Sequence, residues 1–306
     1  MHRLNARLPT VPTVPTVPTV PTALDDLVTL LDLEVIEVNL FRGRSPDESR
    51  QRVFGGQVAG QALVAATRTV EPDRFVHSLH AYFLRPGDPT TPIVYEVDRI
   101  RDGKSFTTRR VVAIQHGKAI FNLQASFHVH EQGPDHQIDM PSHVPAPDSL
   151  PDFRTRMAPY RERMGEWYDR PRPIDIRYID GDPFSRQGNA AAGQRVWMRG
   201  DGVLPDDPTL HACIVTYASD MTLLDTTVLP FGLSWESPDM QMASLDHAMW
   251  FHRPFRADDW LLYDQSAISS GTGRGLAGGA IFTADGTLAI TVVQEGLARV
   301  GRGASA

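Results

Sequence analysis

The chain has 306 residues, of which 41% are hydrophobic and 22% are charged, and its formal net charge is −7. This length and composition are typical of a folded protein with one large domain or two smaller ones, and they exclude a chain that is disordered throughout. The negative charge argues against non-specific binding to nucleic acid, because that binding depends on Lys and Arg side chains that displace counterions from phosphates.

Two further features concern the compartment. The sequence contains no apolar run of the roughly 18 residues that a membrane helix needs, and its N-terminus lacks the apolar core of a secretory signal. The single cysteine, Cys213, excludes intramolecular disulfides and a zinc site made of thiolates alone. We therefore expect a cytoplasmic protein with no membrane span and no nucleic-acid partner.

The N-terminal segment is biased in composition. Residues 8–22 read Leu-Pro-Thr followed by four Val-Pro-Thr triplets. A proline at every third position removes backbone donors and favours the extended polyproline II conformation. We predict a disordered tail over residues 1–23, and the composition favours a dispensable tail over a segment that docks a partner.

The first half of the chain predicts helices followed by a run of strands. Apolar spacing indicates a short amphipathic helix over 25–33, and alternation indicates a strand over 35–41. Small residues over 54–66 predict a helix that packs closely against a sheet and begins at the glycines Gly55 and Gly56. Further strands are predicted at 76–85, 92–100, 105–115 and 119–129.

The remainder predicts a linker and a second domain with the same order of elements. Proline and charge dominate residues 132–172, with one helix expected near 153–167. The second half predicts a helix over 211–224 and strands at 174–179, 195–199, 243–255, 260–269, 274–283 and 287–298. The predicted divisions are a domain at 24–131, the linker at 132–172, a domain at 173–301 and a tail at 302–306.

An internal duplication supports two similar halves. The order aromatic, any residue, Arg, Pro occurs at residues 83–86 and again at 251–254, an offset of 253 − 85 = 168. The same offset places Tyr95 on Tyr263. Residue Gln124 falls on Gln294 at an offset of 170, which predicts a hairpin two residues longer in the second half.

Asp220 is the first candidate for chemistry. On the helix predicted over 211–224, Asp220 shares one face with Cys213, Tyr217 and Leu224, so a carboxylate lies in a largely apolar stripe. Such a carboxylate needs polar partners or a raised pKa, and both are common in active sites. A core carboxylate that is satisfied by a neighbouring hydroxyl or amide fits the pattern equally well.

Two polar residues on strands are weaker candidates. Gln294 ends an apolar row with Ile290 and Val292, and its amide could hold a water molecule or a carbonyl oxygen. Ser244, at the start of the strand predicted over 243–255, could add a hydroxyl group. Taken alone, a glutamine that bonds backbone and a serine that bonds a turn are the more frequent cases.

Other polar residues give weaker signals. His247 and His252 are five residues apart on a predicted strand, so they point to opposite faces and do not predict a metal site. Cys213 reads as an inert buried thiol. Arg99, Arg101, Lys104, Arg109 and Arg110 concentrate positive charge around one hairpin, where they could receive phosphates or only solvate the turn.

Six motifs in order resemble the acyl-CoA thioesterase II family over residues 24–300. They are the Phe-Gly-Gly-Gln at 54–57, Tyr-Phe-Leu-Arg-Pro-Gly-Asp at 82–88, Arg-Asp-Gly-Lys-Ser-Phe at 101–106, Tyr-Ala-Ser-Asp at 217–220, Leu-Asp-His with Met-Trp-Phe-His-Arg-Pro at 245–254, and Val-Gln-Glu-Gly at 293–296. The resemblance implies an α+β double hot-dog fold, in which each half wraps an antiparallel sheet around a central helix.

The resemblance also implies hydrolysis of fatty acyl-CoA to free fatty acid and CoA, with Asp220, Ser244 and Gln294 orienting a water molecule and with no metal or other cofactor. The expected partners are the acyl-CoA substrate and further copies of the chain. The expected substrate contacts are Gly55, Gly56, Gln57, Arg101, Lys104 and Arg109. A non-catalytic acyl-CoA or acyl-carrier binding module is the alternative, and a hot-dog hydratase is disfavoured because its Asp and His motif is not evident.

Overall fold

The computed structural model describes residues 21–46, 51–184, 192–234 and 237–301. Most of the predicted N-terminal tail and all of the predicted tail at 302–306 lie outside these residues. The first described helix, α1 (Ala23–Leu31), begins where the Val-Pro-Thr repeat ends, and Thr22 caps it by accepting a hydrogen bond from Asp25 N–H.

The first half contains the predicted helix and strands. After α1 come β1 (Glu34–Glu37), β2 (Leu40–Gly43), α2 (Gly55–Thr67), β3 (Phe75–Phe83), β4 (Ile93–Asp102), β5 (Phe106–Gln115) and β6 (Lys118–His128). The prediction of a single strand over 35–41 is wrong. The segment is a hairpin of β1 and β2, and Asn39 turns the chain with a positive φ of 64°, a conformation that Asn tolerates better than most residues.

The second half repeats the order of the first. It contains β7 (Ile174–Tyr178), β8 (Gly193–Gly200), α6 (Pro208–Ser219), the 3₁₀ helix η3 (Leu224–Phe231), β9 (Met240–Ser244), β10 (Asp246–Phe251), β11 (Leu261–Gly271), β12 (Arg274–Thr283) and β13 (Leu288–Val300). The strand predicted over 243–255 is divided into β9 and β10, and the helix predicted over 211–224 ends at Ser219.

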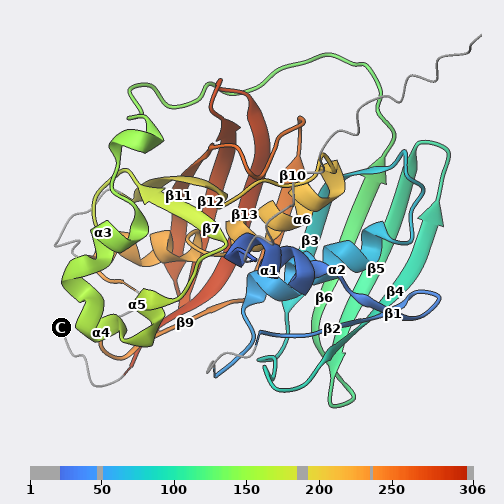
Figure 1. The fold of residues 1–306 in the computed structure, drawn as a ribbon, viewed down its shortest axis with the longest axis horizontal. Helices are drawn as coiled ribbons and strands as arrows, with labels where there is room; N and C mark the ends of the chain where they lie inside the picture. The colour runs from blue at the N-terminus through green and yellow to red at the C-terminus, as the bar shows by residue number, and fades with distance from the viewer. Residues whose placement is uncertain (1–20, 47–50, 185–191, 235–236, 302–306) are drawn as a thin grey trace, which may run out of the picture.

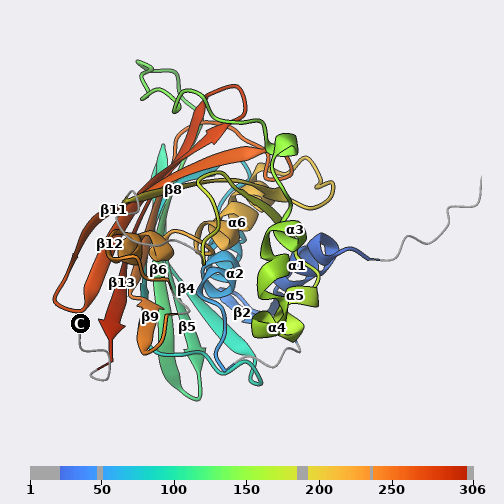
Figure 2. The ribbon, with the colours of Figure 1, turned by 90° about the vertical axis from the view of Figure 1, so that its left-hand side faces the viewer.

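The described strands form one antiparallel sheet in the order β1-β2-β4-β5-β6-β3-β10-β13-β12-β11-β8-β7, with β9 paired to β13. The two halves join where β3 pairs with β10, and Leu79 lies opposite Met249. The sheet curves around α2 and α6, which lie side by side at its centre (Figures 1 and 2). This is the double hot-dog fold that the sequence predicts.

The helices α2 and α6 approach closely because α2 carries small residues on the shared face. A Cβ atom added to Gly56 would lie 2.4 Å from the backbone oxygen of Tyr217, and one added to Gly60 would lie 3.3 Å from that of Cys213. Their contacts bring the start of α2 beside the end of α6. The glycines thus set which helix ends meet.

The strand registers correct the predicted alignment of the two halves. His80 pairs with Gln124, and Ala248, which is 168 residues after His80, pairs with Val293. The counterpart of Gln124 is therefore Val293 at an offset of 169, not Gln294 at 170. The hairpin between β12 and β13 is one residue longer than its counterpart, and the counterpart of Gln294 is Ala125.

The connection between the halves is helical only in short pieces. The helix predicted near 153–167 is divided into α3 (Phe153–Met157), the 3₁₀ turn η2 (Ala158–Tyr160), α4 (Arg161–Met164) and α5 (Glu166–Asp169), preceded by the 3₁₀ turn η1 (Pro147–Ser149). Gly165 ends α4 with a positive φ of 55°. In the described part of the chain, no helix has the length and apolarity to cross a membrane.

Candidate active site

Asp220 lies at the end of α6, not within it as the sequence predicts. Asp207 caps the start of α6 by accepting a hydrogen bond from Thr209 N–H at 2.9 Å, and Pro208 occupies the first helical position, where a missing N–H costs least. Twelve residues later Asp220 forms the C-cap. Because α2 starts beside this point, the carboxylate lies against Gly55, whose added Cβ would be 2.7 Å from Asp220 Oδ2.

Ser244 reaches the same place because of an irregularity in its strand. Leu245 separates β9 from β10, donates its N–H to Glu295 O and accepts from Phe83 N–H. Beyond it, His247 and Met249 point to the buried side of the sheet. The extra residue shifts the alternation by one, as in a β-bulge, so that Ser244 also faces inward.

Gln294 completes a triangle of hydrogen bonds. It follows Ile290 and Val292 on the buried face of β13, as predicted. Its Nε2 donates to Asp220 Oδ1 at 2.5 Å and to Ser244 Oγ at 2.9 Å, and Ser244 Oγ donates to the same Asp220 oxygen at 3.2 Å. Three residues from a helix end, a strand break and a neighbouring strand thus meet.

The carboxyl group of Asp220 is buried, and its pKa is raised. Burial raises its pKa from 3.8 to about 6, while the hydrogen bonds from Gln294 and Ser244 and the backbone N–H of Gly56 act in the opposite direction. The negative end of the α6 dipole disfavours the ionised form and the positive end of α2 favours it. A carboxylate with this pKa can accept a proton at neutral pH and return it.

The acceptor oxygen of Gln294 has no partner within the described residues. Gln294 is fully buried, and its Oε1 makes no hydrogen bond while its Nε2 makes two. Leaving a buried amide oxygen unpaired costs about 1–3 kcal/mol. A donor such as a bound water molecule would satisfy it next to Asp220.

The glycines and the glutamine at the start of α2 differ in what they can offer. Gly55 and Gly56 lie against Asp220, Phe83 and the end of α6. Gln57 is buried, and its Nε2 donates to Arg44 O and Ser45 Oγ, both at 3.1 Å. Its amide donors therefore hold the chain that leads into α2.

Arg109 has no donor left for a phosphate. It is 1% exposed, and its five N–H groups donate to Thr69 Oγ1, Thr69 O, Arg101 O, Thr108 O and Asp102 Oδ1. The substrate contact expected for this side chain gives way to a structural role. The buried position of Arg109 was not predicted from the sequence. The alternation of residues in β5 would have indicated it, but Arg109 was grouped with the neighbouring cations instead.

Arg101 and Lys104 are exposed but lie away from the triangle. Their hairpin is at the end of the sheet where Phe106 pairs with His128 and His128 with Phe75. Phe83 marks the other end of β3, eight residues later. At about 3.3 Å per residue this separates the hairpin from Phe83 by roughly 26 Å.

His247, His252 and Cys213, which the sequence does not assign to a metal site or to catalysis, occupy structural positions. His247 is fully buried, its Nε2 lies 2.8 Å from Ser219 Oγ, and burial lowers its pKa to about 4. His252 is exposed and bonds Thr291, and burial raises the pKa of the Cys213 thiol. Within the described residues, no group of three or more His, Cys, Asp and Glu side chains is arranged to hold a metal ion.

One neighbour of the site was missed. Tyr263 is fully buried beneath the end of α6, where its hydroxyl donates to Ser219 O at 3.4 Å, and burial and then the charge of Asp220 raise its pKa. The sequence marked Tyr263 only as a repeat of Tyr95. Its place on the same strand face as Leu261 and Gln265 would have indicated an inward direction.

The chain is similar in sequence to known proteins. The family model described as acyl-CoA thioesterase matches residues 177–297, and that described as acyl-CoA thioesterase N-terminal domain matches residues 45–128. Acyl-coenzyme A thioesterase 8 of Homo sapiens is 42% identical over 286 residues, which are 90% of this chain and 89% of that protein. Acyl-CoA thioesterase 2 of Haemophilus influenzae is 39% identical over 90% of this chain and 98% of its own length.

Solved structures are similar to this chain as well. The crystal structure of an acyl-CoA thioesterase II from Mycobacterium marinum has a TM-score of 0.76 and 47% identity, and the match covers 91% of this chain and all of that one. A hot-dog protein from Alicyclobacillus acidocaldarius has a TM-score of 0.72 at 21% identity, which supports the fold alone.

Proposed function

Because this chain belongs to the acyl-CoA thioesterase family and hydrolyses acyl-CoA thioesters, we propose that Asp220 is the general base of that reaction and that Ser244 and Gln294 hold the attacking water. The observation that carries the proposal is the unpaired Oε1 of Gln294 beside a carboxylate whose pKa is about 6. Together they provide two acceptors for the two hydrogens of one water molecule.

The reaction follows from these positions. Asp220 takes a proton from the water molecule while the water oxygen attacks the carbonyl carbon of the thioester. This attack forms a tetrahedral intermediate. Collapse of that intermediate breaks the carbon–sulfur bond, and the proton on Asp220 passes to the CoA sulfur. The products are the fatty acid and CoA, and Asp220 is regenerated as a carboxylate.

The start of α2 supplies donors for the developing oxyanion. The N–H of Gly56 already interacts with Asp220, whereas no backbone oxygen among the described loops and turns accepts from the N–H of Gly55. We therefore assign the oxyanion contact to Gly55, with the positive end of the α2 dipole adding to it.

The alternative function, a non-catalytic acyl-CoA or acyl-carrier binding module, is disfavoured. A module that only binds gains nothing from a buried carboxylate, which costs free energy to ionise. The relatives of nearly equal length are named as thioesterases. Release of free thiol from acyl-CoA by the purified chain tests the two functions directly, and no release from short, medium or long acyl chains would support the binding module.

We also propose a cytoplasmic location, no nucleic-acid partner and assembly into homo-oligomers. The lone cysteine and the net charge of −7 support the first two. The third is supported by β1, an edge strand whose four residues are all exposed, including Val35 at 63%. Unpaired edge strands with apolar side chains favour association.

The pH dependence of hydrolysis should report the ionisation of Asp220. Its pKa is raised to about 6, so the base is protonated and inactive below that pH and ionised above it. We expect kcat/KM to rise tenfold per pH unit on the acid side and to level off above a midpoint near pH 6. The profile is measured by thiol release in buffers of constant ionic strength.

Removal of one hydrogen bond should move this midpoint. The hydroxyl of Ser244 stabilises the ionised form of Asp220, so Ser244→Ala is expected to shift the midpoint to higher pH. Ser266→Ala, on the exposed side of β11, is the matched control and should leave it unchanged. A midpoint that stays in place or moves to lower pH in Ser244→Ala would contradict the assignment of the acid side of the pH profile to Asp220.

A further inference from the structure

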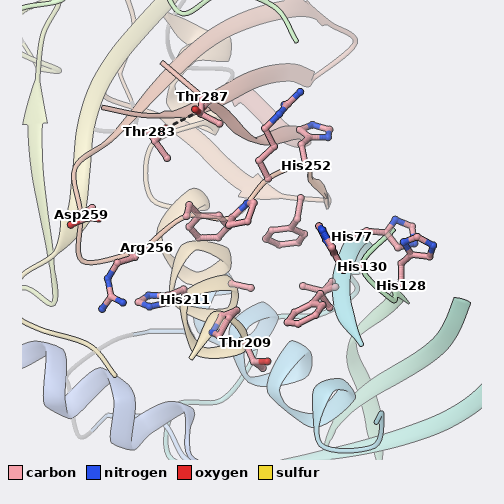
Figure 3. A pocket seen from close by; sticks show the side chains of 18 of the residues that line it. His77, His128, His130, Thr209, His211, His252, Arg256, Asp259, Thr283 and Thr287 are labelled. Atoms are coloured by element: carbon pink, nitrogen blue, oxygen red, sulfur yellow. Dashed lines mark hydrogen bonds between the residues drawn. The ribbon is translucent and has the colours of Figure 1, made fainter. Parts of the chain in front are cut away.

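A large cavity lies at the opposite ends of α2 and α6 from Asp220. Its volume is about 1200 Å³, and its walls include Thr67 at the end of α2 and Pro208 and Thr209 at the start of α6. Figure 3 shows Thr209 and His211 on α6 and His77 on β3 around it. Drug-sized ligands occupy cavities of roughly 300–1,000 Å³, so this one can hold a long acyl chain.

The cavity is the internal-symmetry counterpart of the catalytic site. Val76 pairs with Phe127, and Ser244, 168 residues after Val76, pairs with Gly296, 169 residues after Phe127. Val76 lines the cavity as Ser244 lines the catalytic site, and Phe251 takes the place of Phe83. The cavity and the catalytic site are therefore built on equivalent parts of the two hot-dog halves.

At the positions around the cavity that correspond to Asp220, Ser244 and Gln294, other residues are present. Asp220 caps the end of α6, whereas Arg68 caps the end of α2 and bonds Leu33 O and Asp32. The counterparts of Ser244 and Gln294 are Val76 and Ala125. The cavity thus keeps the framework of the catalytic site but has neither its base nor its amide.

The lining suits an apolar chain with an oxygen-bearing head. Val76, Phe251, Phe255 and Trp260 supply apolar surface. His211 is 2% exposed, and its Nδ1 accepts from Ala257 N–H at 3.0 Å, so the neutral ring carries its proton on Nε2. That Nε2 has no acceptor within the described residues.

The carboxylates of Glu131, Asp206, Asp259 and Asp285 are among the groups that line the cavity, and positive charge also lies next to it. Arg74 lines it and donates from Nη2 to Lys104 O at 3.0 Å, and Val129, another lining residue, donates its N–H to Ser105 O. The exposed side chains of Arg101 and Lys104 belong to this same hairpin. The cations that lie far from Asp220 are thus placed beside this cavity.

We propose that this cavity is a second, non-hydrolytic site that binds a fatty acyl chain with an anionic head, supplied either as acyl-CoA or as released fatty acid. The proposal uses the catalytic assignment only to recognise which positions are replaced. Occupancy of the site is independent of turnover, so each can fail without the other.

The test counts ligands per chain. Titration calorimetry and native mass spectrometry are carried out with S-dodecyl-CoA, a thioether that cannot be hydrolysed, and separately with dodecanoate. We expect the wild-type chain to bind two equivalents of at least one ligand. Thr209→Trp, which fills the cavity, should reduce this to one equivalent and keep kcat/KM within twofold, and Thr209→Ser is the matched control that should retain two.

The two ligands distinguish the sources. A second equivalent of the thioether that weakens in Lys104→Ala identifies acyl-CoA, and a second equivalent of dodecanoate alone identifies the free acid. If Thr209→Trp does not fold, Val76→Glu places a charge in the apolar wall and serves the same purpose. Two equivalents that persist in whichever of these variants folds, or a single wild-type equivalent with both ligands, would overturn the proposal.

Photolabelling of the wild-type chain and of Asp220→Asn complements these cavity variants. Photolabelling with a diazirine-bearing fatty acid is expected to mark peptides that contain residues 75–77 and 208–212, in addition to those near Ser244. Labelling confined to the surroundings of Ser244 and Gly55 counts against a second site. Asp220→Asn should leave the two-site labelling unchanged even if it abolishes hydrolysis.

Discussion

Asp220→Asn is expected to lower kcat for acyl-CoA hydrolysis by about 10²–10⁴-fold, the contribution typical of a positioned general base. Asn has the same shape, and its side-chain oxygen can still accept from Gln294 Nε2 and Ser244 Oγ in place of Asp220 Oδ1. It cannot take a proton from water at neutral pH. The loss should therefore appear in turnover at saturating substrate, measured by thiol release.

The fold should survive this change, because the variant replaces a buried ionisable group by a neutral one. Burial disfavours the ionised form of Asp220, as its raised pKa shows. We expect a thermal midpoint at pH 7 equal to or above that of the wild type. The matched control is Asp246→Asn, which alters a nearby carboxylate that accepts from Glu295 N–H and should retain most turnover. Equal activities of the two variants would refute the assignment of Asp220.

The sequence predicts the order of the helices and strands better than the positions of Asp220, Ser244 and Gln294 on them. Strand alternation in β13 correctly places Ile290, Val292 and Gln294 on one face, because that strand is regular there. Helical periodicity fails for Asp220, since the helix ends one residue before it. The terminus depends on packing against α2, which local spacing does not record.

The position of Ser244 depends on a feature that alternation cannot reveal. An unbroken strand over 243–255 would place Leu245, His247 and Met249 on one face and Ser244 on the other. The break at Leu245 reverses the direction of Ser244 together with the rest of β9. Similarly, one extra residue in the β12–β13 hairpin moves the counterpart of Gln294 from Gln124 to Ala125, so apparent sequence symmetry concealed a chemical asymmetry.

Gly56→Ala should damage both activity and stability. A Cβ atom at this position would lie 2.4 Å from the backbone oxygen of Tyr217 and 2.6 Å from the Phe54 ring. The ring can turn, but the oxygen belongs to α6 and moves only with the helix that ends at Asp220. We expect a loss of about 1–3 kcal/mol in unfolding free energy. Because small misplacements of catalytic groups can cost 10²-fold, kcat/KM should fall by about that factor.

Gly60→Ala, one turn further along α2, separates this backbone clash from the general effect of adding a methyl group. Its Cβ would lie 3.2 Å from a Leu31 methyl group and 3.3 Å from Cys213 O, so shifts of a few tenths of an ångström relieve it. Alanine also favours the helix by about 1 kcal/mol over glycine. Urea denaturation and thiol release should show Gly60→Ala close to the wild type. If both variants behave alike, the contact of Gly56 with α6 does not position Asp220, and the base must be held chiefly by Gln294 and Ser244.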